Sequence, residues 1–124
     1  MTPKKVVLAD DEEHLGSLIK FKLERSGFAV VWTTDGAQAL KAVKAERPDL
    51  VILDVMMPLM SGFEVLERMK ADPVLKAIPV MMLTAQGQEG DVQRGLALGA
   101  VDYLTKPFRP AELLARIQRL FPGT

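Results

Sequence analysis

The chain of 124 residues lacks cysteine altogether. Disulfides, thiolate metal sites and cysteine nucleophiles are therefore excluded. It also lacks an excess of either charge, because sixteen basic side chains balance sixteen acidic ones. No net charge attracts the chain to nucleic acid or to an anionic membrane. No apolar stretch approaches the length of a membrane span, and the first residues do not read as a signal sequence. We therefore expect a cytoplasmic domain that binds neither nucleic acid nor membrane directly.

What the sequence does contain is a regular alternation of two patterns. Five short aliphatic segments are typical of strands buried on both faces of a parallel sheet: residues 6–9, 28–32, 50–53, 80–83 and 101–104. Between them lie longer segments with apolar residues at helical spacing, such as Leu15, Leu18, Ile19 and Leu23. No linker or repeat divides the chain. We predict one α/β domain over residues 1–124, with a doubly wound, five-stranded parallel sheet of flavodoxin-like (βα)5 type and strand order 2-1-3-4-5.

Polar residues stand where these predicted strands end. Asp10 and Asp11 follow the first strand, Asp54 the third, Thr84 the fourth, and Lys106 comes just after the fifth. Ligands of open α/β sheets bind beyond the carboxyl ends of the strands. Two carboxylates about 4 Å apart repel by about 4 kcal/mol at an effective dielectric of 20. Lys106 and a hard divalent cation such as Mg²⁺ would offset this repulsion. Asp54 is then placed as a carboxylate nucleophile that accepts a phosphoryl group.

Each of these residues also has a simpler interpretation. The acids from Asp10 to Glu13 could cap a helix, whose N-terminus favours negative charge. Asp54 alone could be a loop carboxylate, Lys106 a solvated surface lysine, and Thr84 a strand-end hydroxyl. Their joint placement at the ends of four strands that border one site favours the functional interpretation.

The same residues resemble a known family, the receiver domains of bacterial two-component response regulators, or CheY-like domains. The resemblance covers essentially the whole chain. It rests on the pair Asp10-Asp11, on Asp54 within Asp-Val-Met-Met-Pro, on Gly62, on Thr84-Ala85 and on Lys106-Pro107-Phe108. Each motif is weak separately, and the set is highly specific.

The resemblance implies a role for each matching residue. Asp54 is expected to be the phosphoacceptor. Asp11 and Asp54 would ligate Mg²⁺ directly with the backbone carbonyl of Met56, while Asp10 would act through water or by direct contact. Mn²⁺ could substitute for Mg²⁺. Thr84 and Lys106 would hold the phosphoryl oxygens, and the Lys106–Pro107 peptide bond would be cis.

The resemblance also implies a switch and partners. Tyr103 matches the switch aromatic of the family, although it could be only a half-buried strand tyrosine. The expected phosphoryl donor is a sensor histidine kinase or a phosphotransfer protein. An output domain or partner would read the surface of the fourth helix, fifth strand and fifth helix. Receivers that form homodimers through this surface usually carry charges where this chain has Val92, Ala97, Val101 and Gln118. Chiefly Asp102, Glu112 and Arg116 remain of that charge set. A homodimer is therefore possible, but not of the usual salt-bridged type.

Two positions bear on the lifetime of the phosphorylated state. Met56 lies two residues after Asp54, and Gln86 lies two residues after Thr84. Both should border the path of an attacking water. A thioether orients water poorly, whereas an amide can offer one hydrogen bond. We expect slow to moderate self-dephosphorylation.

Three other functions are weighed against this one. A haloacid-dehalogenase-like phosphatase needs a second acid where Met56 stands, and the chain has no room for a substrate cap. A nucleotide-binding module needs a glycine-rich phosphate loop, and neither common form of that loop occurs. A receiver that works without phosphorylation would not need the complete acidic site. We therefore expect a signalling domain that catalyses only its own phosphorylation and dephosphorylation.

Overall fold

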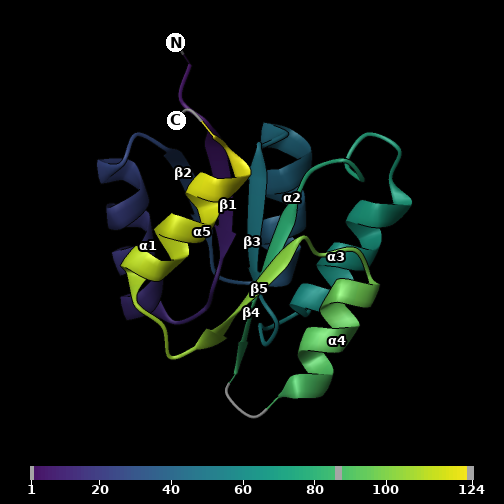
Figure 1. The fold of residues 1–124 in the computed structure, drawn as a ribbon. Coiled ribbons are helices and arrows are strands. Elements are labelled where there is room, and N and C mark those ends of the chain that lie inside the picture. Colours follow the sequence, from purple (N-terminus) through teal and green to yellow (C-terminus); the bar gives the residue numbers. More distant parts are fainter. Residues whose placement is uncertain (1, 86–87, 123–124) are drawn as a thin grey trace.

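The computed structural model describes residues 2–85 and 88–122. Its five strands are parallel and lie in the order β2-β1-β3-β4-β5, which confirms the predicted fold class. Strands and helices alternate along the chain (Figure 1): β1 (Lys5–Ala9), α1 (Glu13–Arg25), β2 (Ala29–Thr33), α2 (Gly36–Glu46), β3 (Leu50–Asp54), α3 (Gly62–Ala71), β4 (Val80–Ala85), α4 (Glu89–Ala97), β5 (Asp102–Lys106) and α5 (Pro110–Leu120).

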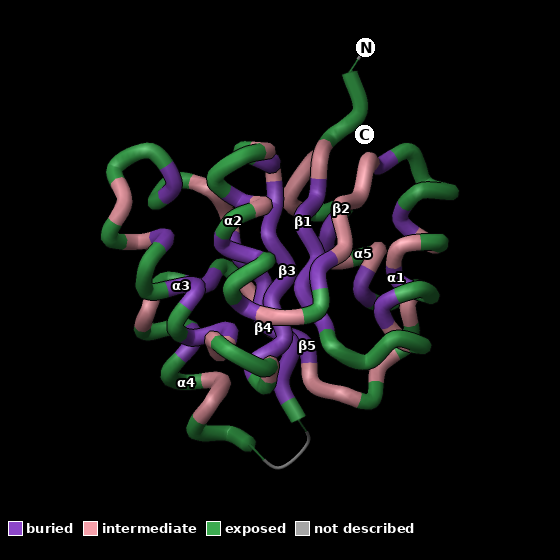
Figure 2. The backbone as a smooth tube through the Cα atoms, turned by 180° about the vertical axis from the view of Figure 1, so that it is seen from behind, coloured by how far each residue is buried: buried purple, intermediate pink, exposed green. Residues whose placement is uncertain are grey.

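Helices cover both faces of the sheet, as the apolar strands require. On one face, α1 and α5 pack on the sheet through residues such as Ile19 and Ile117. On the other face, α2 and α3 pack through residues such as Val43 and Leu66. Figure 2 shows that the buried residues concentrate along the central strands. Every residue of β3 is buried, whereas the edge strand β2 is mostly half-buried. The site-bearing strands are therefore held rigidly by two apolar cores.

Local signals place the helices that follow the strands. Asp35 begins α2 by accepting a 2.7 Å hydrogen bond from the backbone N–H of Gln38. Ser61 caps α3 by accepting a 3.2 Å bond from the N–H of Glu64. Pro110 stands at the start of α5, where its missing N–H costs no helical hydrogen bond.

The structure corrects some details of the predicted elements. Leu18 is 41% exposed and does not belong to the buried stripe of α1, which consists of Gly16, Ile19 and Leu23. The last strand begins at Asp102, not at Val101, and it includes Lys106. Its apolar core residue, Leu104, lies at the middle of the strand and not at its end. Within the part of the chain that the structure describes, no helix could cross a membrane.

Candidate functional site

Three charged side chains lie at the carboxyl ends of the strands, on one face of the sheet, just beyond its apolar core. Side chains alternate between the two faces of a strand, so residues two apart share a face. Asp10, Asp54 and Lys106 each follow by two positions a residue of the core under α1 and α5, namely Leu8, Ile52 and Leu104. The strands are adjacent or nearly so and run in parallel. The alternation thus delivers two acids and a lysine to the same end of the same face.

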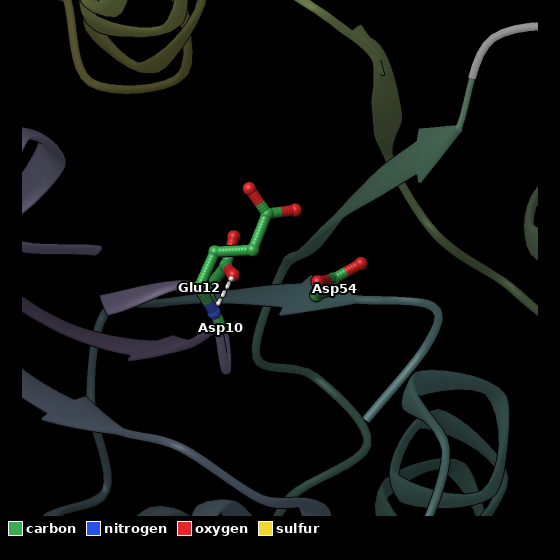
Figure 3. A group of neighbouring side chains, drawn as sticks. All are labelled: Asp10, Glu12 and Asp54. Atoms are coloured by element: carbon green, nitrogen blue, oxygen red, sulfur yellow. Dashed lines mark hydrogen bonds between the residues drawn. The ribbon is translucent and has the colours of Figure 1, made fainter. Parts of the chain in front are cut away.

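Lys106 is the cation at the centre of this group. Its Nζ lies 3.0 Å from Oδ2 of Asp54, 3.2 Å from Oδ2 of Asp10 and 2.7 Å from Oε1 of Glu12. Figure 3 shows the three carboxylates, with Glu12 reaching over Asp10 toward the end of the strand that carries Asp54. One ammonium therefore faces three carboxylates.

Asp10 is fully buried, and its two carboxylate oxygens differ in their surroundings. Oδ1 accepts a 2.8 Å hydrogen bond from the backbone N–H of Glu12. Oδ2 forms the ion pair with Lys106 but accepts no hydrogen bond from any residue that the structure describes. An incompletely satisfied buried carboxylate oxygen is costly, so this atom has capacity for a further cationic partner.

Asp54 is the last residue of β3 and is buried as well. Its Oδ1 accepts a 3.3 Å hydrogen bond from the backbone N–H of Met56, and its Oδ2 accepts one from Lys106. The start of α3 packs directly on this strand end: any Cβ on Gly62 would collide with the backbone carbonyl of Asp54. Glycine at position 62 therefore allows the close approach that fixes the backbone under the Asp54 carboxylate.

Burial, together with the neighbouring charges, shifts the pKa values of all three groups. The pKa of Asp54 is raised to about 6 as the balance of opposing effects: burial and the neighbouring Asp10 raise it, while Lys106 and the Met56 N–H act to lower it. Burial also raises the pKa of Asp10 above its ordinary value, against the effect of the Glu12 N–H and Lys106. For Lys106, burial alone would lower the pKa, but the bonds to Glu12 and Asp54 raise it above its ordinary value. Lys106 is thus firmly cationic, and it does not fully neutralise the acids.

The donor set fits a hard divalent cation. Carboxylate oxygens of Asp10, Glu12 and Asp54 all lie within 4.8 Å of one another. Mg²⁺ prefers oxygen ligands and is commonly bound by one or two carboxylates. The unsatisfied Oδ2 of Asp10 adds a buried oxygen that such an ion would complete.

Asp11, in contrast, lies outside the carboxylate group found in the structure. Asp11 is exposed. The sequence predicted Asp11 beside Asp10 and Asp54, whereas in the structure the third carboxylate of the group is that of Glu12. The sequence marked Glu12 only as one of several acids near a helix start. Its signal was its position two residues after Asp10, which allows a turn to bring the two carboxylates together.

The other predicted residues surround the group. Thr84 lies in β4, and its buried hydroxyl makes no hydrogen bond to any described residue. Tyr103 is half-buried and packs against the core under α2 and α3. The peptide bond between Lys106 and Pro107 is cis. Met56 is 73% exposed beside Asp54, whereas Gln86 lies outside the described residues.

The fold and this acidic site define a class of protein, and comparison with known sequences identifies it. A family model described as the response regulator receiver domain matches residues 6–118, so the chain belongs to that family. The alkaline phosphatase synthesis transcriptional regulatory protein PhoP of Bacillus subtilis is 44% identical over 117 residues, which cover 94% of this chain and 48% of PhoP. The phosphate regulon regulatory protein PhoB of Rhizobium meliloti is 42% identical, covering 97% of this chain and 52% of PhoB. The chain spans about half the length of these curated relatives.

Solved structures agree with this assignment. The chemotaxis response regulator CheY4 of Vibrio cholerae superposes with a TM-score of 0.90 at 35% identity, over 97% of this chain and all of CheY4. The receiver domain of a sensor histidine kinase from Pseudomonas aeruginosa gives a TM-score of 0.85 at 30% identity, over 94% of this chain and 96% of that domain. That structure contains a magnesium ion coordinated in its active-site cleft. The resemblance to two-component receiver domains is thereby confirmed. Phosphorylation on aspartate and binding of Mg²⁺ are general features of the family.

Proposed function

We propose that this chain receives a phosphoryl group on Asp54 and, in response, changes the surface that a downstream partner reads. The observation that carries the proposal is the buried position of Asp54 at the end of β3, with Lys106 Nζ 3.0 Å from its Oδ2 and with Asp10 at the same ammonium. A carboxylate in this position is a nucleophile next to a fixed positive charge. Positioning and charge neutralisation dominate phosphoryl transfer, so no separate base is needed.

The acids of the site would hold the divalent cation that phosphoryl transfer requires. Bound Mg²⁺ would supply neutralisation of the negative charge that develops on the transferring group. Asp10 and Asp54 are supported as ligands by their membership in the carboxylate group, and Glu12 is a further candidate. The assignment of Asp11 and of the Met56 backbone carbonyl as ligands stays a prediction. Mn²⁺ has similar ligand preferences and is expected to substitute.

Lys106 and Thr84 would hold the oxygens of the transferred group. The Lys106 ammonium already donates a hydrogen bond to the Asp54 carboxylate. Its positive charge would attract the oxygens of a phosphoryl group bound to Asp54. Thr84 lies one position beyond Leu83, the β4 residue that pairs with Asp54 across the sheet. Its hydroxyl has no partner among the described residues and is free to donate a hydrogen bond.

Thr84 also links the site to Tyr103. Thr84 and Met82 lie on the same side of β4, and Tyr103 pairs with Met82. If the hydroxyl of Thr84 moves toward a phosphoryl group, the space that it leaves becomes available to the Tyr103 ring. To shift the populations of the inactive and active conformations from 99:1 to 1:99, the phosphoryl group must favour the active one by about 5.5 kcal/mol. Several charge-assisted contacts can supply that preference.

The surface that would change comprises α4, β5 and α5. Leu96 and Val101 are exposed there and do not belong to the core. Arg116 is already occupied within the chain, 3.0 Å from Asp102 and 3.7 Å from Glu112. The three charges that remain of the usual dimer set therefore pair with one another. This arrangement favours an apolar contact with an output domain or partner, or a homodimer without the usual salt bridges.

The proposed donor is a sensor histidine kinase or a phosphotransfer protein, as in two-component systems, and the proposed location is the cytoplasm. We also propose that residues 1–124 form one receiver domain, which agrees with the single sheet and with the family match over 6–118. The chemistry assigned to the chain is limited to its own phosphorylation and dephosphorylation.

Intact-mass spectrometry tests the proposal. The domain is incubated with Mg²⁺ and a small acyl or amido phosphate donor, with Asp54→Ala as the matched variant. We expect one phosphoryl group that is labile in alkali and absent from the variant. Labelling that persists in Asp54→Ala would remove the central assignment. Multiple turnover of a phosphate ester by the wild-type chain would instead indicate a phosphatase.

A further inference from the structure

Trp32 is the single tryptophan of the chain, and its side chain contacts the backbone of the acidic site. It lies on the edge strand β2, where it pairs with Leu8 of β1 and packs on the core under α1 and α5. Its indole Nε1 donates a 3.0 Å hydrogen bond to the backbone carbonyl of Asp10. A side chain of the edge strand thus holds the backbone of the most buried acid of the site.

This contact completes the attachment of Asp10 to β2. The backbone N–H of Asp10 donates a 3.0 Å hydrogen bond to the carbonyl of Thr33. The β1–β2 pairing ends at Ala9 and Thr33, so the next carbonyl, that of Asp10, lies beyond the ladder. The indole N–H supplies the donor that the ladder no longer provides. Both backbone polar groups of Asp10 are therefore fixed by the same strand.

The position of the indole depends on a glycine in α1. A Cβ on Gly16 would collide with Cε2, Cζ2 and Nε1 of the Trp32 ring. Glycine within a helix is unfavourable relative to alanine, so its presence in the interior of α1 calls for a steric reason. The close approach of the ring provides that reason. Gly16 and Trp32 form a complementary pair, in which the missing side chain of one makes room for the other.

We propose that Trp32, seated in the space left by Gly16, is a positioning residue that fixes the Asp10 carboxylate for the divalent cation. The backbone of Asp10 is held by β2, and its Oδ1 is held by the Glu12 N–H. Oδ2 lies 3.2 Å from Lys106 Nζ, accepts no hydrogen bond from the described residues, and is the Asp10 oxygen that faces the cation site. Release of the Asp10 carbonyl allows its peptide to rotate and moves that oxygen. Groups that orient a metal ligand in this way contribute measurably to metal affinity. The inference rests on the proposed function, because it concerns the same cation site.

Replacement of the N–H alone gives the sharpest test. Since the chain has one tryptophan, growth of a tryptophan auxotroph on benzothienylalanine replaces Nε1–H by sulfur at position 32 while keeping the ring shape. Trp32→Phe is the second variant. Val30→Ala is the matched control, because Val30 packs on the same core two residues earlier in β2 and pairs with Val6, away from Asp10.

Mg²⁺ affinity is then measured by isothermal titration calorimetry. We expect the dissociation constant to rise roughly three- to tenfold in the benzothienyl protein, as loss of one hydrogen bond predicts, and to stay unchanged in Val30→Ala. In the wild-type chain, the fluorescence of Trp32 should follow the same titration curve. Unchanged Mg²⁺ affinity in the benzothienyl protein overturns the proposal, whatever the Phe variant does.

Amide hydrogen exchange without divalent ions supplies a readout that does not depend on metal binding. The N–H of Glu12, which is bonded to Asp10 Oδ1, should exchange several-fold faster in the benzothienyl protein than in the wild type or in Val30→Ala. A wild-type chain that binds no Mg²⁺ contradicts the proposed function. In that case, exchange of the Glu12 amide alone tests the positioning role of Trp32. Faster exchange in the benzothienyl protein shows that Trp32 fixes the backbone at Asp10, and equal exchange shows that it does not.

Discussion

Lys106 Nζ lies 3.0 Å from Asp54 Oδ2, and both side chains are largely buried at the end of the sheet. The same ammonium also contacts Asp10 and Glu12, so it is outnumbered by carboxylates. Burial and the neighbouring Asp10 raise the pKa of Asp54, whereas the surrounding carboxylates raise the pKa of Lys106. The site is short of positive charge, and that shortage prepares it for a divalent cation.

The first prediction concerns the pH dependence of stability. The pKa of Asp54 is raised from 3.8 to about 6 in the folded chain. The folded state then binds a proton more tightly than the unfolded state, so its stability falls as pH rises from about 4 to about 6. Above this range, the shift corresponds to a loss of about 3 kcal/mol in the free energy of unfolding, because the folded state then holds Asp54 charged. Asp54→Asn should therefore be more stable than the wild type at pH 7.5 without divalent ions, by roughly 1–3 kcal/mol.

Urea unfolding in EDTA at several pH values measures this effect. The difference between Asp54→Asn and the wild type should shrink as pH falls through about 6 toward 4, because Asp54 of the wild type then takes up a proton. Lys106 keeps Asp10 and Glu12 as partners in the variant. A wild type that is more stable than Asp54→Asn at pH 7.5 would show that the ion pair outweighs the burial of the charge.

A second prediction concerns Lys106, the cation at the centre of the group. Lys106→Met keeps an apolar stem but leaves Asp10 and Asp54 buried without the ammonium. Loss of one partner of a buried ion pair is strongly destabilising, and we expect a loss of about 2–4 kcal/mol at pH 8 without divalent ions. The control is Lys20→Met, whose ammonium lies 3.9 Å from Glu24 on an exposed helix face. That control should change stability by less than about 1 kcal/mol. Equal losses in the two variants would contradict a special role for Lys106.

A third prediction concerns the lifetime of the phosphorylated chain. Met56 is largely exposed two residues beyond Asp54, where we expect an attacking water to approach the carboxylate. An amide can orient that water, whereas a thioether orients it poorly. Met56→Asn should therefore hydrolyse several-fold faster than the wild type, while Met56→Leu, which keeps an apolar side chain, should keep the wild-type rate. Decay of the phosphorylated mass after removal of the donor gives the rates. A wild-type half-life of only seconds would contradict the expected slow to moderate hydrolysis.

The sequence predicted the fold and the gathering of Asp10, Asp54 and Lys106 because both follow from short-range rules. Aliphatic strands that alternate with helices form a parallel sheet, and side-chain alternation carries those three residues to one face. Leu18 has the helical spacing of the apolar stripe but is 41% exposed, because an apolar residue at this spacing can lie at the border of the buried face. Whether it is covered depends on the neighbouring helix, which a local pattern does not contain.

Glu12 and Trp32 show the limit of sequence reasoning at the site. The Glu12 carboxylate joins the group because its backbone N–H is bonded to Asp10 and its long side chain reaches Lys106 across 94 residues of sequence. Trp32 reaches Asp10 only because Gly16, on another element, leaves room for its ring. Both contacts depend on three-dimensional complementarity between separate segments, for which a single sequence carries no periodic signal.

The most direct measurement of the central claim locates the phosphoryl group on the chain. The domain is phosphorylated with a small donor and Mg²⁺ and reduced with borohydride, which converts an acyl phosphate to an alcohol, and its peptides are then sequenced by mass spectrometry. We expect the reduced side chain at position 54 alone, and none when EDTA replaces Mg²⁺. Reduction at Asp10, Asp11 or Glu12 instead, or labelling that does not need a divalent cation, would contradict the account.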